Sequence, residues 1–242
     1  MSFPLVLLPG LLCDRAVWAS QCDELSDIAN CIVPNYGTLR TISDMAQFVL
    51  DSVPGRFAVA GHSMGGRVAL EVVCAAPSRV IQLALLDTGY EARQDGSAGE
   101  EEKASRLRLL DLAYRKGMRA VGIEWTPGMV RTETLDTPVY QAILDMIERS
   151  SPDLFEAQIH ALLTRPDATR VLSEIRCPTL LLCGREDRWS PVARHEAMHK
   201  AIENSVMCVV EEAGHMVTME QPVAVNAALR DWLLTESEGE ST

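Results

Sequence analysis

Residues Phe57 to Leu70 read FAVAGHSMGGRVAL. The run opens with four apolar residues that are typical of a buried strand, continues through the glycine-flanked segment 61–65, and ends in an apolar stretch of helical character. The pattern predicts a strand, a sharp turn with Ser63 at its apex, and a helix.

A serine at such an apex is held in a strained backbone conformation, so Gly61 and Gly65 must lack side chains to let the strand and the helix pass closely. The strain exposes the hydroxyl of Ser63. The first amides of the following helix point toward its surroundings, a place suited to a developing negative charge. Ser63 is therefore a candidate nucleophile, and the alternative is a chance occurrence of a short pattern.

Composition and charge limit the functions open to the chain. Its 242 residues, 47% apolar and 23% charged, match one soluble α/β domain with room for an insertion. A net charge of −12 argues against nucleic-acid binding, which needs a basic face. The first apolar run has no preceding Lys or Arg, and no run approaches the ~20 residues of a membrane span. We expect a cytoplasmic protein with no membrane or nucleic-acid partner.

The seven cysteines are scattered and lack the close-pair spacing of a zinc site. We expect them to be reduced and mostly buried, and we expect no metal site. None lies at a turn that would expose and activate a catalytic thiol.

Apolar runs alternate with helical patterns along most of the chain. Runs typical of strands lie at 5–8, 31–34, 57–60, 80–86, 178–184 and 206–210. Asp14 and Ser43 are candidate caps for two of the helices between them, and a last helix is expected at 222–234. This alternation predicts a mainly parallel sheet flanked by helices, with right-handed crossovers.

The alternation breaks between residues 91 and 170. An acidic, glycine-bearing stretch (94–102) precedes helical patterns at about 103–117, 138–149 and 152–164, with a kink or turn at 125–128. We predict a core made of residues 1–90 and 171–242 and an inserted helical lid at 91–170. The alternative is an ordinary run of surface helices.

Four segments each follow a strand and are therefore expected at one edge of the predicted sheet. Open parallel sheets bind ligands at that edge, just beyond the carboxyl ends of their strands. They are residues 9–11, the turn at Ser63, the loop holding Asp187 and the loop holding His215.

A serine hydroxyl is a poor nucleophile unless a base takes its proton during attack. A base that a carboxylate holds in one orientation does this best. His215 follows a strand and a glycine in a loop, whereas His160, His195 and His199 fall within helical patterns and His62 should point away. Asp187 is the candidate orienting acid because it follows a strand and lies between serine and histidine in chain order. Asp87 is the rival and Glu186 a weaker third.

At this point the chain resembles the α/β-hydrolase fold family, from near residue 3 to about 235. The matching segments are GHSMGG at 61–66, GRED at 184–187 and GHM at 214–216. The resemblance implies that Ser63, Asp187 and His215 are nucleophile, acid and base, and that the backbone N–H groups of Leu11 and Met64 form an oxyanion hole.

Two features depart from the family pattern. Pro9-Gly10 stands where members usually show His-Gly, so the polar contacts of that histidine are missing while the backbone donor remains. The antiparallel edge strands that many members carry before the first parallel strand are not expected here. Neither departure affects the three side chains above.

The sequence predicts a serine hydrolase that cleaves small or medium carboxylic esters through an acyl-enzyme on Ser63, without metal or organic cofactor. The candidate residues for an apolar substrate pocket are Leu11, Leu12, Trp125 and Met216. A purely packing role is the alternative for each of them. The same three residues would serve a carbon–carbon bond hydrolase, an enol-lactone hydrolase or a thioesterase. A non-catalytic small-molecule binder is the second class, and the chain is expected to be a monomer or homodimer.

Overall fold

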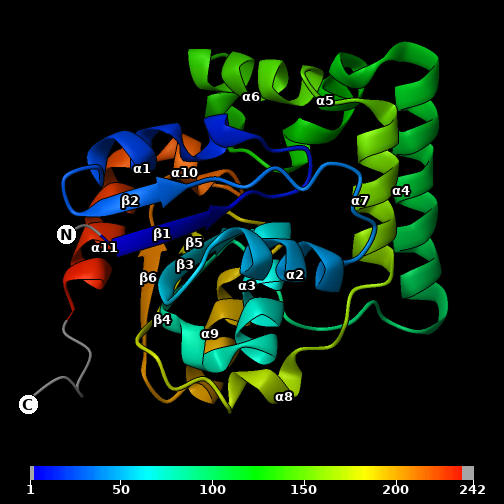
Figure 1. Cartoon of the computed structure of the whole chain (residues 1–242). Coiled ribbons are helices and arrows are strands. Elements are labelled where there is room, and N and C mark those ends of the chain that lie inside the picture. The colour runs from blue at the N-terminus through cyan, green and yellow to red at the C-terminus, as the bar shows by residue number, and fades with distance from the viewer. Residues whose placement is uncertain (1–2, 236–242) are drawn as a thin grey trace, which may run out of the picture.

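The computed structural model describes residues 3–235, in which six strands form one parallel sheet in the order β2-β1-β3-β4-β5-β6 (Figure 1). The strands are β1 (Phe3–Leu8), β2 (Ala29–Ile32), β3 (Phe57–His62), β4 (Val80–Leu86), β5 (Thr179–Gly184) and β6 (Ser205–Val210). Each neighbouring pair is parallel, as the alternation of strands and helices predicted.

The central strands are buried on both faces, which explains why they read as continuous apolar runs. All six residues of β3 and of β5 are buried. The two edge strands β2 and β6 are only partly buried, because each pairs with a single neighbour.

Helices cover both faces of the sheet (Figure 1). On one face lie α1 (Ala19–Glu24), α10 (Val217–Glu220) and α11 (Pro222–Leu234), and on the other lie α2 (Ile42–Ser52), α3 (Met64–Ala75) and α9 (Val192–Ala201). α1 packs against α11, and α2 packs against α3. Short 3-10 turns at Arg15–Trp18 and Pro77–Arg79 precede α1 and β4.

Two local predictions near the N-terminal half need correction. The second strand is Ala29–Ile32 rather than 31–34, because it pairs with β1 only up to Ile32.

The cap of α2 is Thr41 and not Ser43. Thr41 has extended backbone and its hydroxyl accepts from the Asp44 N–H, whereas Ser43 lies inside the helix. Asp14 does cap, through the Ala16 N–H.

A helical insertion separates β4 from β5. It contains α4 (Gly96–Lys116), α5 (Met118–Trp125), α6 (Pro138–Glu148) and α7 (Pro152–Leu163), with 3-10 turns at Thr126–Gly128 and Thr132–Thr134, and the short α8 (Thr169–Leu172) follows. The acidic stretch that was expected to precede the first helix forms most of its first two turns, so α4 begins earlier than predicted.

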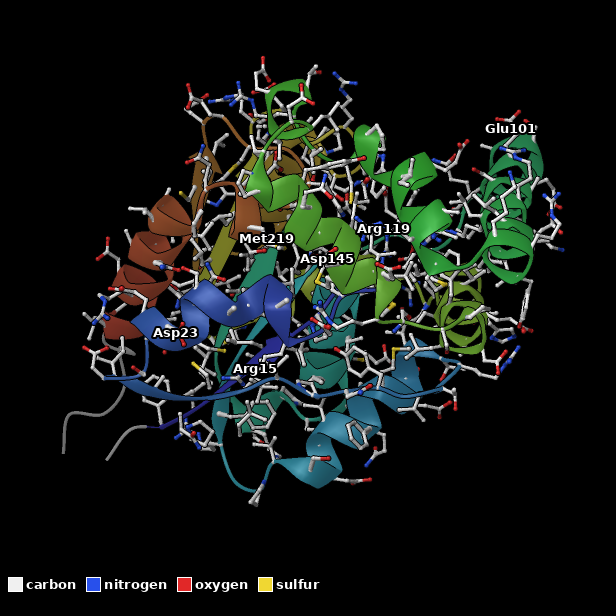
Figure 2. All side chains as sticks on the ribbon, turned by 90° about the horizontal axis from the view of Figure 1, so that it is seen from above. Arg15, Asp23, Glu101, Arg119, Asp145 and Met219 are labelled. Carbon is white, nitrogen blue, oxygen red and sulfur yellow. The ribbon has the colours of Figure 1, made fainter. Side chains whose placement is uncertain are left out.

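The insertion is held together by helix packing and by ion pairs on its surface. α4 packs against α5 and α7, and α5 packs against α6. Arg119 of α5 lies 2.8 Å from Asp145 of α6, and the two side chains face each other in Figure 2. Arg119 also pairs with Glu148 at 2.7 Å. These contacts make α5 and α6 one packed unit.

The order in which strands are added to the sheet changes side at β1. The strand β2 lies on one side of β1, and β3 to β6 lie on the other side. Open parallel sheets bind ligands at such a switch point, beyond the carboxyl ends of the strands. The insertion stands beyond those ends (Figure 1). Among residues 3–235, no helix is long and apolar enough to cross a membrane.

Candidate active site

Ser63 occupies the sharp turn between β3 and α3, with φ 54° and ψ −116°. Positive φ is costly for a residue with a side chain and persists only where the surroundings impose it. A Cβ on Gly61 would lie 2.3 Å from the Gly65 carbonyl oxygen, and a Cβ on Gly65 would lie 2.1 Å from that of Leu8. Both glycines are therefore needed for the approach of strand and helix, as the sequence predicted.

The structure brings Ser63, His215 and Asp187 together. Nε2 of His215 lies 2.8 Å from the Ser63 Oγ, and its Nδ1 lies 2.8 Å from Oδ2 of Asp187. His215 and Asp187 are 4% and 3% exposed, so the pair is shielded from solvent. An ionised Asp187 accepts from Nδ1–H, which leaves Nε2 as the acceptor that faces the hydroxyl of Ser63.

Asp187 is held by its own loop as well as by His215. Its Oδ1 accepts hydrogen bonds from the backbone N–H groups of Trp189 and Ser190, at 2.8 and 2.9 Å. Burial by itself raises the pKa of Asp187, but the charge of His215 and the accepted hydrogen bonds outweigh it and lower the pKa to about 2. The carboxylate is thus ionised at neutral pH.

The two rival acids occupy other places. Asp87 is fully buried and accepts from the Gly184 N–H at 2.9 Å, and burial followed by the nearby charge of Asp187 raises its pKa well above the usual value. Glu186 forms an ion pair with Arg131 at 2.8 Å. Asp187 alone among the three accepts from the ring of His215.

His62 was expected to point away from the site, and this is wrong. Its Nε2 lies 2.7 Å from the backbone carbonyl oxygen of His215, and the two rings are 5.4 Å apart. Burial and then the charge of His215 lower the pKa of His62 to about 4, so the ring is neutral and Nε2–H donates to the carbonyl. His62 therefore supports the loop that carries His215.

The two residues whose backbone N–H groups were predicted to form an oxyanion hole lie at the same cavity as Ser63. Leu11 and Met64 both line the cavity that contains Ser63. Met64 is the first residue of α3, so its N–H precedes the first intrahelical hydrogen bond. The Leu11 N–H donates to no other residue within 3–235. A Cβ on Gly10 would lie 3.2 Å from Cβ of Ser63, which brings the loop after β1 against the serine.

The cavity has a volume of about 630 Å³ and is lined partly by the sheet edge and partly by the insertion. Trp125 and Met216, both named from the sequence, line it. Trp189 also lines it, although the sequence reasoning missed it, and its ring stacks on Trp125 at 5.1 Å and lies 5.0 Å from His215. Its position two residues after Asp187 was the available signal.

Leu12, the third pocket residue named from the sequence, does not line this cavity. It is 2% exposed, has φ 60°, and its N–H donates to the side chain of Gln158 at 2.9 Å. It lines a second cavity with Gln158 and Cys13. The hydrogen bond to α7 directs this residue into the packing beneath the insertion.

The cysteines are all free, but only Cys22 and Cys183 are buried and Cys74 is exposed, so the expectation that most are buried is wrong. Cys13 is only partly exposed at the border of the cavity, and desolvation of its thiol, followed by the charge of Asp14, raises its pKa to about 12. Cys13 is therefore a thiol and not a nucleophilic thiolate at neutral pH. Across residues 3–235, no three or more His, Cys, Asp or Glu side chains are grouped to hold a metal ion.

Known proteins share this architecture. An esterase of pimeloyl-[acyl-carrier protein] methyl ester from Nitrosomonas europaea is 25% identical over 238 residues, which cover 90% of each chain. A thermophilic esterase from Thermogutta terrifontis, studied with malate bound, is 31% identical, covers 96% of this chain and 90% of its own, and superimposes with a TM-score of 0.86.

A third solved structure, the enol-lactonase from Burkholderia xenovorans, superimposes with a TM-score of 0.83 at 20% identity, covering 96% of this chain and 92% of its own, and shares the fold. The family described as "Alpha/beta hydrolase family" matches residues 5–228. The protein thus belongs to the alpha/beta hydrolase family.

Proposed function

We propose that the protein is a serine esterase that cleaves small or medium carboxylic esters through an acyl-enzyme on Ser63. The observation that carries the proposal is the continuous hydrogen-bonded chain from the Ser63 hydroxyl through His215 to Asp187, with 2.8 Å at each step. This chain opens into a cavity large enough for a small molecule. The two esterase relatives support the same reaction class.

In the proposed first step, Oγ of Ser63 attacks the ester carbonyl carbon while Nε2 of His215 takes its proton. The protonated ring then passes that proton to the departing alcohol. Asp187 stays ionised and stabilises the positive charge on His215, in keeping with its lowered pKa. Water, deprotonated by the same ring, next attacks the acyl-enzyme and releases the carboxylic acid.

The negative charge that develops on the carbonyl oxygen requires donors that are already in place. We assign this role to the backbone N–H groups of Leu11 and Met64, which flank Ser63 from the loop after β1 and from the start of α3. Because both are backbone groups, the absence of a histidine at Pro9 does not remove them.

The insertion supplies part of the substrate site in this proposal. Trp125 of α5 and Phe155 of α7 line the cavity above Ser63, and Trp125 stacks on Trp189 from the core. Aromatic faces of this kind suit an apolar acyl or alcohol group. We therefore propose that α4–α7 act as the lid over the site.

The deciding experiment compares the wild-type protein with Ser63→Ala and with Ser43→Ala, an exposed hydroxyl on α2 that bonds Glu71. On p-nitrophenyl butyrate, S63A should lose roughly 10⁶-fold in kcat, by analogy with serine proteases, whereas S43A should match wild type. A fluorophosphonate should label wild type and S43A but not S63A. Folded wild-type protein that resists labelling and hydrolyses no ester would favour a non-catalytic binder.

A panel of esters, lactones, thioesters and vinylogous diketones identifies the bond that is cleaved. All of these would pass through the same Ser63 adduct, so the ratio of their kcat/KM values distinguishes an esterase from an enol-lactone hydrolase, a thioesterase or a carbon–carbon bond hydrolase. The esterase proposal expects simple carboxylic esters to have the highest values.

A further inference from the structure

The wall of the cavity beyond Ser63 carries four guanidinium groups. They come from separate parts of the chain: Arg67 from α3, Arg106 from α4, Arg165 from the segment after α7, and Arg194 from α9. The chain as a whole has a net charge of −12, so a gathering of arginines at one cavity runs against its overall balance.

The acids that line the same cavity do not neutralise these arginines. Glu102 is shared by two of them, with a bidentate contact to Arg165 at 2.7 and 2.9 Å and an ion pair with Arg106 at 2.9 Å. Glu91 lies 3.8 Å from Arg194.

The third acid that lines the cavity, Asp87, is fully buried, and burial followed by the nearby charge of Asp187 raises its pKa well above the usual value, which favours its neutral form. The cavity lining therefore holds four guanidinium groups and three acids, one of which is Asp87, so cationic side chains outnumber acidic ones.

Arg67 is the arginine without a carboxylate. No acid among residues 3–235 lies within ion-pair distance of it, and its Nη1 donates to the backbone carbonyl of Glu91 at 2.7 Å. Burial first, and then the neighbouring charges of Arg165 and Arg194, lower its pKa to about 9. A partly buried guanidinium with spare donors is a costly arrangement unless an anion completes it.

The position of Arg67 relates it directly to the reacting serine. It lies in the first turn of α3, four residues after Ser63 in the chain, and both residues line the cavity. A Cβ on Gly89 would lie 2.9 Å from Nη2 of Arg67 and 3.2 Å from Cδ of Arg194, so the two arginines meet where Gly89 leaves room. The cavity thus has an aromatic side at Trp125 and a cationic side at Arg67.

We propose that this arginine wall binds a carboxylate of the substrate, so that the preferred substrates are esters that carry a second, free carboxylate, such as half-esters of small dicarboxylic acids. The inference rests on the proposed esterase function and adds its substrate class. A guanidinium presents a planar fork of donors that matches the two oxygens of a carboxylate. Ser63 then meets the ester carbonyl while the far end of the molecule is held at Arg67 and Arg194.

The test compares monomethyl esters of four- to seven-carbon dicarboxylic acids with methyl esters of monocarboxylic acids of the same length, by titration of the acid released. For the wild type, kcat/KM should be at least about 10-fold higher for the half-ester. In Arg67→Gln the ratio of half-ester to neutral-ester kcat/KM should fall about 10- to 100-fold. Arg194→Gln should lower the ratio in the same direction and serves if R67Q does not fold.

The control is Arg108→Gln, an exposed arginine on α4 two residues from Arg106 that does not line the cavity. R108Q should keep the wild-type ratio. If esters are hydrolysed in a Ser63-dependent way but the wild type shows no preference for half-esters, or R67Q leaves the ratio unchanged, the arginine wall is not a substrate subsite.

A different result would count against the esterase proposal while still testing the anion site. If no ester is hydrolysed, calorimetric titration with glutarate decides: binding to the wild type that R67Q weakens at least about 10-fold supports a carboxylate site. Equal binding, or none, refutes it.

Discussion

The carboxylate of Asp187 accepts a hydrogen bond from Nδ1 of His215 across 2.8 Å, in a setting where both side chains are almost fully withdrawn from solvent. Asp87, directly after the neighbouring strand β4, is buried as deeply and accepts hydrogen bonds from the backbone N–H groups of Gly184 and Val217. The pKa values of these two neighbouring acids are therefore shifted in opposite directions: that of Asp187 is lowered to about 2, and that of Asp87 is raised by burial. This pairing gives each acid a different expected response to the same substitution.

Asp187→Asn should lower kcat/KM about 10⁴-fold, the size of loss found when the orienting acid of a serine protease is made neutral. The amide oxygen would keep the Trp189 and Ser190 N–H groups, so the NH2 group would face Nδ1 and donate to it. His215 would then be held in the wrong tautomer and would lose the stabilising negative charge. Asp87→Asn keeps the shape and an acceptor of a carboxyl group whose neutral form burial favours, and should lose far less kcat/KM. Steady-state kinetics on one ester, with circular dichroism to confirm folding, distinguish the two. Equal losses would contradict the assignment of Asp187.

The parts of this site that the sequence predicted are those encoded locally. The turn at Ser63 requires two glycines at fixed spacing, and the central strands require unbroken apolar runs, so both were visible in a single window. Asp187 and His215 could be named because each follows a strand at the same sheet edge. The edge strand β2 was misplaced because pairing with β1, and not composition, sets its bounds.

The parts that were missed depend on packing between distant segments. Arg67, Arg165 and Arg194 are separated by long stretches of sequence and meet only when the insertion closes over α3 and α9. His62 was misjudged because its partner is a backbone carbonyl 153 residues away. The start of α4 was missed because glycine and consecutive acids weaken the helical pattern, although exposed acids are tolerated on a surface helix.

Gly65→Ala should destabilise the protein even though the residue lies inside a helix. On helix propensity alone the change would stabilise by about 1 kcal/mol. The new Cβ would instead lie 2.1 Å from the Leu8 carbonyl oxygen, so overpacking should lower the free energy of unfolding by about 3 kcal/mol or more. Urea denaturation measures the difference.

Gly128→Ala is the matched control for that substitution. A Cβ there would meet its nearest atoms, in the ring of Trp189, at an ordinary 3.6 Å. G128A should keep nearly the wild-type stability. An unchanged midpoint for G65A would show that the strand and helix are not pressed together at this point.

The stability of the fold should fall between about pH 6.5 and pH 4 because two histidines are buried in the neutral form. Burial is the main cause that lowers the pKa of His62 and of His195 to about 4, while an unfolded histidine keeps its ordinary value near 6.5. Above about pH 6.5 both histidines are neutral in the folded and in the unfolded protein, so they add no pH dependence to the free energy of unfolding. As the pH falls below 6.5 the unfolded state binds protons that the folded state does not, and stability drops by at most about 1.4 kcal/mol per pH unit for each histidine.

His195→Gln removes one of these two groups and should flatten the slope across that window, whereas His199→Gln, at an exposed position on the same helix, should leave the slope unchanged. The measurement is the free energy of unfolding in urea at half-unit steps from pH 7.5 to 4. Asp187 adds a second loss at lower pH, since its folded pKa of about 2 lies below its ordinary value of 3.8. Asp87 acts in the opposite direction, because its raised folded pKa makes the folded state bind that proton first, but it contributes equally to the wild type and to H195Q. Equal slopes for the wild type and H195Q would therefore contradict the buried neutral state of His195.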